Sequence, residues 1–310
     1  MGMGGVASTE TRIKTMVAMK DFFRSDFAKA SRFHWDFHKE FRDTQRWEQL
    51  AISYSDWKQG LAQPQNTDII PKVIHQIWLG PKPLPDLYRQ WGKSWLHHNP
   101  DFTYRLWRDC DIDSFGLQNR GLYDSTDNYG ARSDLARYEI LHRLGGIYVD
   151  TDFECVAPIP RSLLSFSFVA CLMFNSTPEI SNGMLMAAPD SPLLAKVIRA
   201  CTKAEHPKDM FSILHSTGPF LLTREYFEAS SQQDSLRLVL PSNYFFPWPN
   251  FAMDFKGDPH GFIAEESIGI HHWQTSWFER PRQGIRYHLK AAVKSLIRTP
   301  QRLRKYTDRL

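Results

Sequence analysis

Residues 132–154 decide the fold, and their sequence is RSDLARYEILHRLGGIYVDTDFE. The larger side chains in the first part recur at helical intervals of three and four: Leu135, Tyr138, Leu141 and His142. This spacing predicts a helix over residues 131–144 that ends at the Gly145-Gly146 pair. The apolar run at 147–149 predicts a short buried strand, which ends in Asp150-Thr151-Asp152.

Two further strands are predicted upstream of this stretch. Residues 72–79, KVIHQIWL, form an apolar run that ends at Gly80, and residues 102–107 form a second such run. Strands that alternate with helices favour an α/β fold with a largely parallel sheet. Residues 12–62 contain no Pro and carry aromatic residues at helical spacing, which predicts two or three amphipathic helices before a linker at 63–68.

The acid pair Asp150 and Asp152 stands where α/β proteins place their ligands, just past the carboxyl end of a strand. Oxygen ligands suit Mg²⁺ or Mn²⁺, and such a cation can neutralise a diphosphate leaving group. The pairs Asp109–Asp111 and Asp111–Asp113 have the same spacing. They follow Trp107 in a polar turn, so we interpret them as solvated loop or helix-capping residues.

Asp134 and Arg137 lie one helical turn apart on the predicted helix and share a face. These two residues and Tyr148 precede the acid pair, and all of them lie within 20 residues of sequence. Their functional interpretation is donor binding, and the alternative is a surface ion pair without a ligand.

Residues 132–154 resemble the signature of glycosyltransferase family 32, the group with the DxD sugar-binding motif. This group includes fungal α-mannosyltransferases and animal α-1,4-galactosyltransferases, and it is similar here to the glucosylating domain of clostridial toxins. The resemblance extends to VIHQIWLG at 73–80, TGP at 217–219 and IHHWQTSW at 270–277, so it covers about 210 residues. Four motifs in order are far more specific than a single DxD.

The resemblance implies a GT-A type fold and a nucleotide-sugar donor bound through a divalent cation, Mn²⁺ or Mg²⁺. Trp78 would stack on the donor base beside Ile77, although plain core packing of Trp78 is an open alternative. Asp134 and Arg137 would hold the donor ribose, sugar or diphosphate, and Tyr148 would contact the donor.

The resemblance also assigns the metal site. Asp150 would meet the ribose or sugar and, through water, the metal, while Asp152 would ligate the metal directly. A histidine completes the site, and both His271 and His272 are candidates, with the family pattern favouring His271; a histidine without a metal is the alternative. Ser276 and Trp277 would reach the diphosphate.

Composition excludes several classes of protein. The chain has 310 residues, 42% of them hydrophobic and 23% charged, which is typical of a folded protein rather than a disordered one. The formal net charge of +4 is too small to indicate nucleic acid. Neither a signal peptide nor a transmembrane helix is expected, so the predicted location is cytoplasmic or peripheral to a membrane.

The basic residues concentrate at the C-terminus, where nine Lys or Arg and one acid occur between Arg282 and Arg309. The first six of them, from Arg282 to Arg302, recur every four residues beside an apolar stripe, which predicts a basic amphipathic helix over 281–310. Such a helix could lie on an anionic membrane, or pack its apolar stripe on the domain.

The expected organisation is an N-terminal helical segment at 1–66, a GT-A catalytic domain at 67–280 and the basic helix. The expected reaction is transfer of a hexose from GDP-mannose or a UDP-hexose, with retention, to a glycan, lipid or small molecule. The alternatives are a nucleotide-sugar hydrolase, a toxin-like enzyme that glucosylates protein, and a non-catalytic membrane or nucleic-acid binding module with a decayed core.

Overall fold

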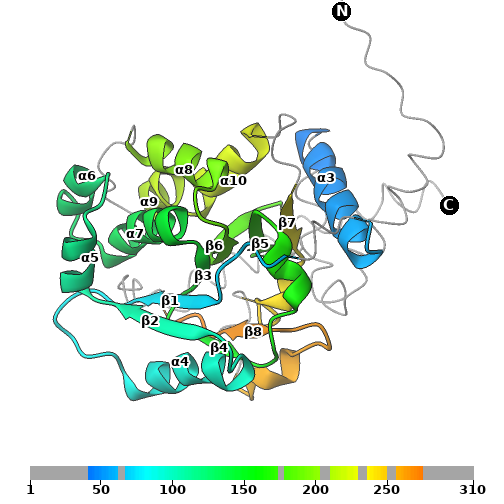
Figure 1. Ribbon diagram of the computed structural model, residues 1–310, viewed down its shortest axis with the longest axis horizontal. Helices are drawn as coiled ribbons and strands as arrows, with labels where there is room; N and C mark the ends of the chain where they lie inside the picture. Colours follow the sequence, from blue (N-terminus) through cyan, green and yellow to red (C-terminus); the bar gives the residue numbers. More distant parts are fainter. Residues whose placement is uncertain are drawn as a thin grey trace, which may run out of the picture. The chain divides into compact units, whose positions relative to one another are not determined.

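The computed structural model describes residues 41–61, 67–173, 178–202, 210–229, 236–249 and 256–274. A six-stranded sheet lies at its centre, with strand order β2-β1-β3-β6-β5-β7 (Figure 1). Its strands are β1 (Val73–Ile77), β2 (Thr103–Trp107), β3 (Gly146–Val149), β5 (Phe168–Leu172), β6 (Ile180–Ala187) and β7 (Arg237–Leu240). The three strands expected from the sequence are all present.

The sheet is mixed but largely parallel, as predicted. Strands β1, β2 and β3 run in one direction, and β5 and β7 are parallel to each other. Only β6, among the strands of this sheet, runs against its neighbours β3 and β5. The carboxyl ends of β1 and β3 therefore meet at the edge where β6 begins, which is where ligands bind in α/β sheets.

Helices cover one face of the sheet (Figure 1). They are α7 (Tyr129–Leu144), α8 (Pro192–Thr202), α9 (Met210–Ser216) and α10 (Pro219–Glu228). Helix α7 contacts β3 and β6, and α10 also packs on β6. The α7 helix starts two residues before the predicted one because the Asn128 side chain caps it by accepting a hydrogen bond from the Ala131 N–H. It ends at Gly145, whose φ of 64° lies in the left-handed region that glycine favours.

A second, two-stranded sheet joins distant parts of the sequence. Strand β4 (Phe153–Cys155) pairs antiparallel with β8 (Gly269–His271), so that Phe153 lies opposite His271. Helix α4 (Asp86–His98) packs on β4, and the indole N–H of buried Trp95 donates to the Phe153 carbonyl. Residues 270–274 of the sequence motif are thereby brought next to the acid pair that precedes β4.

Helix α3 (Phe41–Lys58) packs on strand β7 at the edge of the large sheet. Its buried side chains include Trp47, Leu50, Ala51 and Tyr54. This part of the predicted N-terminal helical segment therefore covers the sheet. Residues 1–40 and the basic helix expected at 281–310 lie outside the described residues.

The two rival acid pairs lie at helix α5 (Asp109–Phe115), which is followed by α6 (Arg120–Asp124). Asp111 accepts a hydrogen bond from the Arg108 backbone N–H at 2.8 Å and caps α5, while Asp113 pairs with Arg120 at the surface. Their interpretation as capping or solvated residues is confirmed for Asp111 and Asp113, whereas half-buried Asp109 accepts a hydrogen bond from the Gly80 backbone N–H at 2.8 Å. Short 3₁₀ turns complete the described elements: η2 (Arg161–Ser165), η3 (Ser242–Tyr244) and η5 (Pro259–Phe262).

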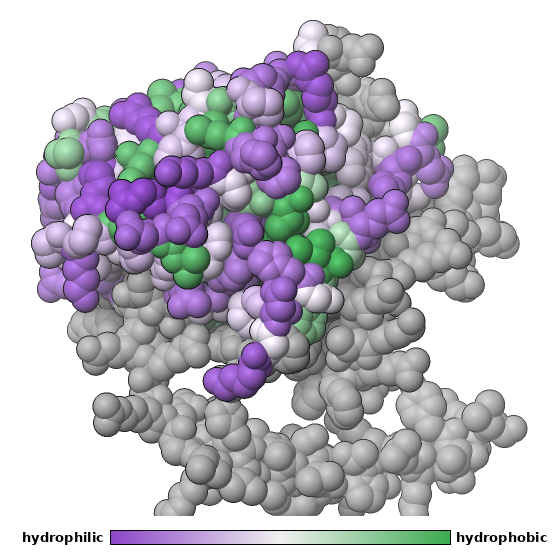
Figure 2. Space-filling view, turned by 90° about the horizontal axis from the view of Figure 1, so that it is seen from below, coloured by the Kyte–Doolittle hydropathy of each residue, from purple (hydrophilic) through white to green (hydrophobic). Residues whose placement is uncertain are grey.

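The surface of the described part is mainly hydrophilic on the face shown in Figure 2, where hydrophobic residues form small separate groups. Exposed large hydrophobic side chains include Leu87 and Leu96 on α4. Among the helices that the structure describes, none combines the length and the apolar character needed to cross a membrane.

Candidate active site

Three potential metal ligands converge at the carboxyl edge of the sheet. Asp150 and Asp152 follow β3, and His271 is the last residue of β8. One ligand atom from each of these residues lies within 4.8 Å of the others. The Nε2 atom of His271 is 3.1 Å from Oδ1 of Asp152. The structure therefore brings together the acid pair and the histidine that the sequence separates by about 120 residues.

Asp152 is held on both carboxylate oxygens. Its Oδ1 faces His271, and its Oδ2 accepts a hydrogen bond from the Gln274 backbone N–H at 2.7 Å. Burial acts to raise the pKa of Asp152, but the charge of His271 and the hydrogen bonds from His271 and Gln274 hold that pKa below its usual value. Asp152 is thus maintained as an anion in a buried position.

Asp150 lies in a different environment. Its Oδ1 accepts a hydrogen bond from the Tyr148 hydroxyl at 2.6 Å and is 3.3 Å from Nη1 of Arg137. Burial raises the pKa of Asp150, Arg137 opposes that rise, and the nearby charge of Asp152 adds to it. About 31% of its side chain remains exposed, compared with 9% for Asp152. Asp150 is therefore the more accessible acid of the pair.

Arg137 lies behind Asp150 and is almost fully buried. Its guanidinium donates to the Asn182 carbonyl at 2.7 Å and to both the carbonyl and the hydroxyl of Ser133. It also lies 4.4 Å from the centre of the Tyr148 ring. These contacts fix the positive charge of Arg137 beside the acid pair. Groups of the chain itself surround the guanidinium on several sides.

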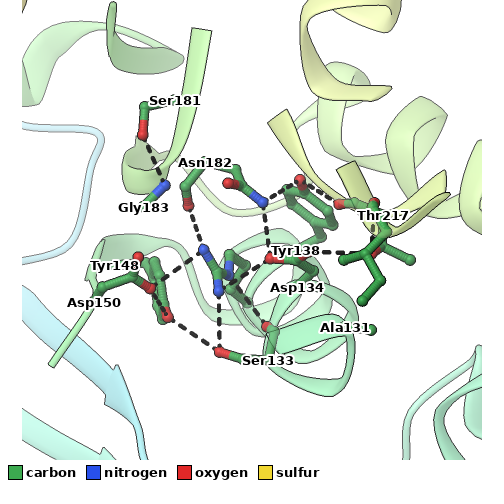
Figure 3. Close-up of polar contacts among 12 residues, drawn as sticks. Ala131, Ser133, Asp134, Tyr138, Tyr148, Asp150, Ser181, Asn182, Gly183 and Thr217 are labelled. Carbon is green, nitrogen blue, oxygen red and sulfur yellow. Dashed lines mark hydrogen bonds and ion pairs between the residues drawn. The ribbon is translucent and has the colours of Figure 1, made fainter. Parts of the chain in front are cut away.

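Asp134 is the second partner of Arg137, at 3.1 Å. Its carboxylate also accepts hydrogen bonds from the Asn182 amide at 2.8 Å and the Thr217 hydroxyl at 3.0 Å (Figure 3). Burial is the main cause that raises its pKa to about 7, although Arg137 counteracts it. The ion pair is buried, with only 5% and 9% of the two side chains exposed, so the alternative of a surface ion pair is wrong.

Trp78 directly follows β1, at the same edge of the sheet as Asp150. Its indole N–H donates to the Lys82 carbonyl, and its ring meets the Tyr88 ring edge-on at a centroid distance of 5.6 Å. Trp78 is partly exposed, whereas its neighbour Ile77 is buried. One partly exposed ring therefore lies at the edge of the sheet that carries the acid pair.

The two adjacent histidines have different surroundings. His271 faces Asp152, but Nε2 of His272 lies 2.9 Å from Glu154, and the His272 ring stacks on Trp91 at 4.0 Å. Only His271 lies with the acid pair, in agreement with the family pattern. Ser276 and Trp277 lie outside the described residues.

Several residues of the site carried no role in the sequence analysis. Asn182 and Gly183 lie on β6 beside Arg137 and Asp150, and Thr217 was noted only as part of a motif. A glycine inside a strand, such as Gly183, often marks a position that another group approaches closely, and this signal is visible in the sequence. The others are assembled by long-range pairing, for which a single sequence carries no local signal.

Tyr88 is also new to the site. Its ring stacks on Trp91 at 5.3 Å, and burial together with the charge of Asp152 raises its pKa to about 12. The phenol is therefore protonated at neutral pH, and its hydroxyl has no hydrogen-bond partner among the residues that the structure describes. It can donate a hydrogen bond to a ligand.

Comparison with known proteins agrees with this geometry. A family model described as "Glycosyltransferase sugar-binding region containing DXD motif" matches residues 85–169, which include Asp150 and Asp152. Inositol phosphoceramide mannosyltransferase 1 of Schizosaccharomyces pombe is 29% identical over 72% of this chain and 72% of its own length. An uncharacterized glycosyltransferase of Acanthamoeba polyphaga mimivirus is 29% identical over 58% of this chain and 74% of its own length.

A third relative is a mannosyl phosphorylinositol ceramide synthase of Saccharomyces cerevisiae, 29% identical over 61% of this chain; the match spans 52% of that relative's length. Among solved structures, the PaToxG glycosyltransferase is 16% identical, covers 72% of this chain and 81% of its own, and has a TM-score of 0.45. The family model and these relatives agree with the resemblance seen in the sequence: the chain carries the sugar-binding region with the DXD motif, it is a glycosyltransferase, and its fold is α/β.

Proposed function

We propose that this glycosyltransferase transfers a hexose from a nucleotide-diphosphate sugar in a reaction that depends on a divalent cation. The observation that carries the proposal is the convergence of Asp150, Asp152 and His271, whose ligand atoms lie within 4.8 Å of one another. This cluster lies at the sheet edge where α/β proteins bind nucleotides, and its two acids lie inside the matched sugar-binding region.

The three residues fit a divalent cation. Two carboxylates supply hard oxygen ligands for Mg²⁺ or Mn²⁺, and the imidazole nitrogen shifts the preference toward Mn²⁺. Two acids this close repel each other, and a cation offsets that repulsion. When bound, the cation would offset the charge that develops on the diphosphate leaving group.

The protein's own residues orient the acids and the donor. Tyr148 and Arg137 hold Oδ1 of Asp150 in place, and Asp134 in turn holds Arg137. The polar groups of these three residues are engaged within the chain, so we propose that they act on the donor through Asp150.

The base and diphosphate of the donor would meet other residues. Trp78 would offer its partly exposed ring to the base, beside Ile77, since aromatic rings bind bases by stacking. The Tyr88 hydroxyl, which lies within the electrostatic reach of Asp152, would donate to a diphosphate oxygen. We retain Ser276 and Trp277 as diphosphate contacts, on the resemblance alone.

The relatives suggest the sugar and the acceptor. Those of the two yeasts are named as enzymes that mannosylate inositol phosphoceramide. We therefore propose GDP-mannose as the donor and a ceramide with a phosphoinositol headgroup as the acceptor, with retention of the α configuration. The sequence leaves glycan, lipid and small-molecule acceptors open, and this proposal selects the lipid.

The test is an assay of the full chain with Mn²⁺ and a panel of GDP-mannose, UDP-glucose and UDP-galactose. Inositol phosphoceramide, ceramide and a free oligosaccharide serve as acceptors in parallel. We expect GDP release and a mannosylated lipid only with GDP-mannose and the phosphoinositol lipid, with the anomeric configuration read by NMR. Nucleotide release that is equal without any acceptor would instead identify a hydrolase.

A further inference from the structure

Three aromatic rings enclose the imidazole of His271. Its ring centroid lies 4.5 Å from that of Phe153, 5.4 Å from that of Phe246 and 4.3 Å from that of Trp273. The Nδ1 atom of His271 is buried and has no hydrogen-bond partner among the described residues. Metal-binding imidazoles usually donate their second N–H to a carboxylate or a carbonyl, which fixes the ring. At His271, aromatic packing takes the place of that hydrogen bond.

Trp273 is the ring of this cage that lies nearest to His271, and it is itself anchored. Its indole N–H donates to the Trp248 carbonyl at 2.7 Å, and its ring packs on Phe246 at 5.7 Å. The Trp273 and His271 rings are nearly perpendicular, at 84°. Rotation of the imidazole would therefore require the anchored indole to move.

The backbone of Trp273 is unusual as well. Its φ of 53° lies in the left-handed region, which a bulky side chain rarely adopts without a compensating role. The turn at this residue aims the Gln274 N–H at Oδ2 of Asp152, at 2.7 Å. On the other side of the turn, the His272 N–H donates to the Asp152 carbonyl at 2.9 Å. Residues on both sides of Trp273 thus hold Asp152.

We infer that Trp273 is a positioning residue for the cation site: its ring orients His271, and its left-handed backbone places the Gln274 amide on Asp152. The inference rests on the cation site of the proposed function. It gives one residue, which is not itself a metal ligand, the role of orienting two of the proposed ligands, His271 and Asp152.

The test measures Mn²⁺ affinity without nucleotide, from the EPR signal of free Mn²⁺. Trp273→Gly removes the ring, yet glycine adopts a left-handed φ readily, so the variant isolates the contribution of the ring. We expect its Mn²⁺ affinity to fall about 10- to 100-fold, the usual effect of losing a group that supports a metal ligand. The preference for Mn²⁺ over Mg²⁺ should fall with it, because that preference comes from the imidazole nitrogen.

A double-mutant cycle with His271→Ala separates this role from a general structural one. If Trp273 acts through His271, Trp273→Gly should change the Mn²⁺ affinity much less in the His271→Ala background than in the parent. Asp190→Gly is the matched control, because Asp190 also has a left-handed φ, of 56°, and is not part of the site. Its Mn²⁺ affinity should equal that of the parent.

Two results would overturn the inference: parental Mn²⁺ affinity in folded Trp273→Gly, or an equal loss with and without His271. If Trp273→Gly does not fold, Trp273→Phe replaces it; this variant keeps a ring without the N–H anchor and should bind Mn²⁺ measurably more weakly. Parental affinity in Trp273→Phe would then overturn the inference. Asp152→Asn is run in parallel, and parental affinity in that variant would remove the cation site and the proposed function together.

Discussion

At the scale of single residues, the two acids of the site are arranged for different tasks. Both oxygens of Asp152 have partners in the chain, from His271 and Gln274. Asp150 uses Oδ1 for Tyr148 and Arg137, while its Oδ2 has no hydrogen-bond partner among the described residues. A ligand can therefore reach Asp150 more easily, and Asp152 supplies a fixed negative charge.

Asp152→Asn should leave the fold intact, because the amide has nearly the shape of the carboxylate. It removes a charge from the cation site, so turnover should fall by about a hundredfold or more, in line with the loss of a preorganised electrostatic element. Initial rates at saturating donor and Mn²⁺ measure the effect. In the parent, EDTA should abolish turnover and Mn²⁺ should restore it.

The control for this substitution is Asp113→Asn, which alters an acid of the rival pattern at α5 and should keep the parental rate. Parental turnover in Asp152→Asn, or full turnover of the parent in EDTA, would show that the acid pair holds no cation that the reaction needs. The cation-dependent mechanism would then be abandoned.

Gly183 is the backbone position that allows Asp150 its place. A β-carbon at residue 183 would come within 2.7 Å of Oδ2 of Asp150, closer than real β-carbons approach. Because that oxygen is at the end of a side chain, Gly183→Ala should displace the acid rather than unfold the strand. We expect Mn²⁺ affinity to fall about tenfold or more, as for other supporting groups of metal sites, measured by EPR.

Gly121→Ala is the matched control for Gly183→Ala, since a β-carbon at residue 121 on α6 would meet nothing within 4 Å. It should leave the Mn²⁺ affinity unchanged. Thermal melting of both variants checks the fold. Parental Mn²⁺ affinity in a folded Gly183→Ala protein would contradict the prediction, because it would show that displacing Asp150 does not weaken cation binding.

At the scale of elements, His75 ties three strands and a helix end together. On β1, its Nδ1 accepts a hydrogen bond from the Trp107 indole of β2 at 3.1 Å. Its Nε2 donates to the carbonyl of Gly145, between α7 and β3, also at 3.1 Å. Both ring nitrogens are satisfied in the neutral form, and a proton on Nδ1 would break the bond from Trp107.

Burial lowers the pKa of His75 from 6.5 to about 4, and the charge of Arg105 adds to this effect against the hydrogen bond to Gly145. Protonation therefore favours the unfolded chain, and the stability that this residue supplies is complete above pH 6.5 and is lost as the pH falls toward 4. The loss between pH 6.5 and 5 should be about 2 kcal/mol, since one pKa unit corresponds to about 1.4 kcal/mol. Urea unfolding at several pH values measures it.

His75→Gln isolates this contribution because glutamine keeps a donor and an acceptor but does not titrate in this range. Its free energy of unfolding should depend less on pH between 6.5 and 5 than that of the parent. His97→Gln, at an exposed position on α4, should follow the parent. Equal slopes for all three proteins would contradict the prediction.

The elements near residues 132–154 could be predicted because their signals are local. Spacing and the Gly145-Gly146 pair indicate α7 and β3, and the apolar run at 72–79 indicates β1. Strand β6 was not predicted, although Asn182 and Gly183 complete the site from it. Its place between β3 and β5 depends on pairing across the chain, which no local pattern encodes.

The choice between His271 and His272 shows the same limit. Adjacent residues of a strand point to opposite faces, so one of them must face away from the acid pair. Which one does so depends on the register between β8 and β4, where His271 lies opposite Phe153. From the residues alone, both histidines stayed open, and only the resemblance favoured His271.

At the scale of the whole molecule, positive charge is distributed unevenly along the chain. Nine of the 38 basic residues, but only one of the 34 acidic residues, lie between Arg282 and Arg309. The remainder of the chain therefore carries a small negative formal charge. An acceptor with a lipid anchor would be reached at a membrane surface, and the segment with the excess positive charge is the one suited to an anionic surface.

We predict that residues 282–310 bring the enzyme to anionic membranes. Each basic residue near such a surface contributes about 1 kcal/mol of attraction, so neutralising three of them should weaken binding about a hundredfold. The variant Lys290→Gln, Lys294→Gln, Arg298→Gln makes this change, and co-sedimentation with vesicles of phosphatidylserine and phosphatidylcholine measures it. Three exposed basic residues elsewhere, Lys58, Arg199 and Arg224, changed to Gln give a control with the same net charge, which should bind like the parent. Binding of the parent that is equal on neutral vesicles, or equal weakening in both triple variants, would show that the segment does not recognise an anionic surface.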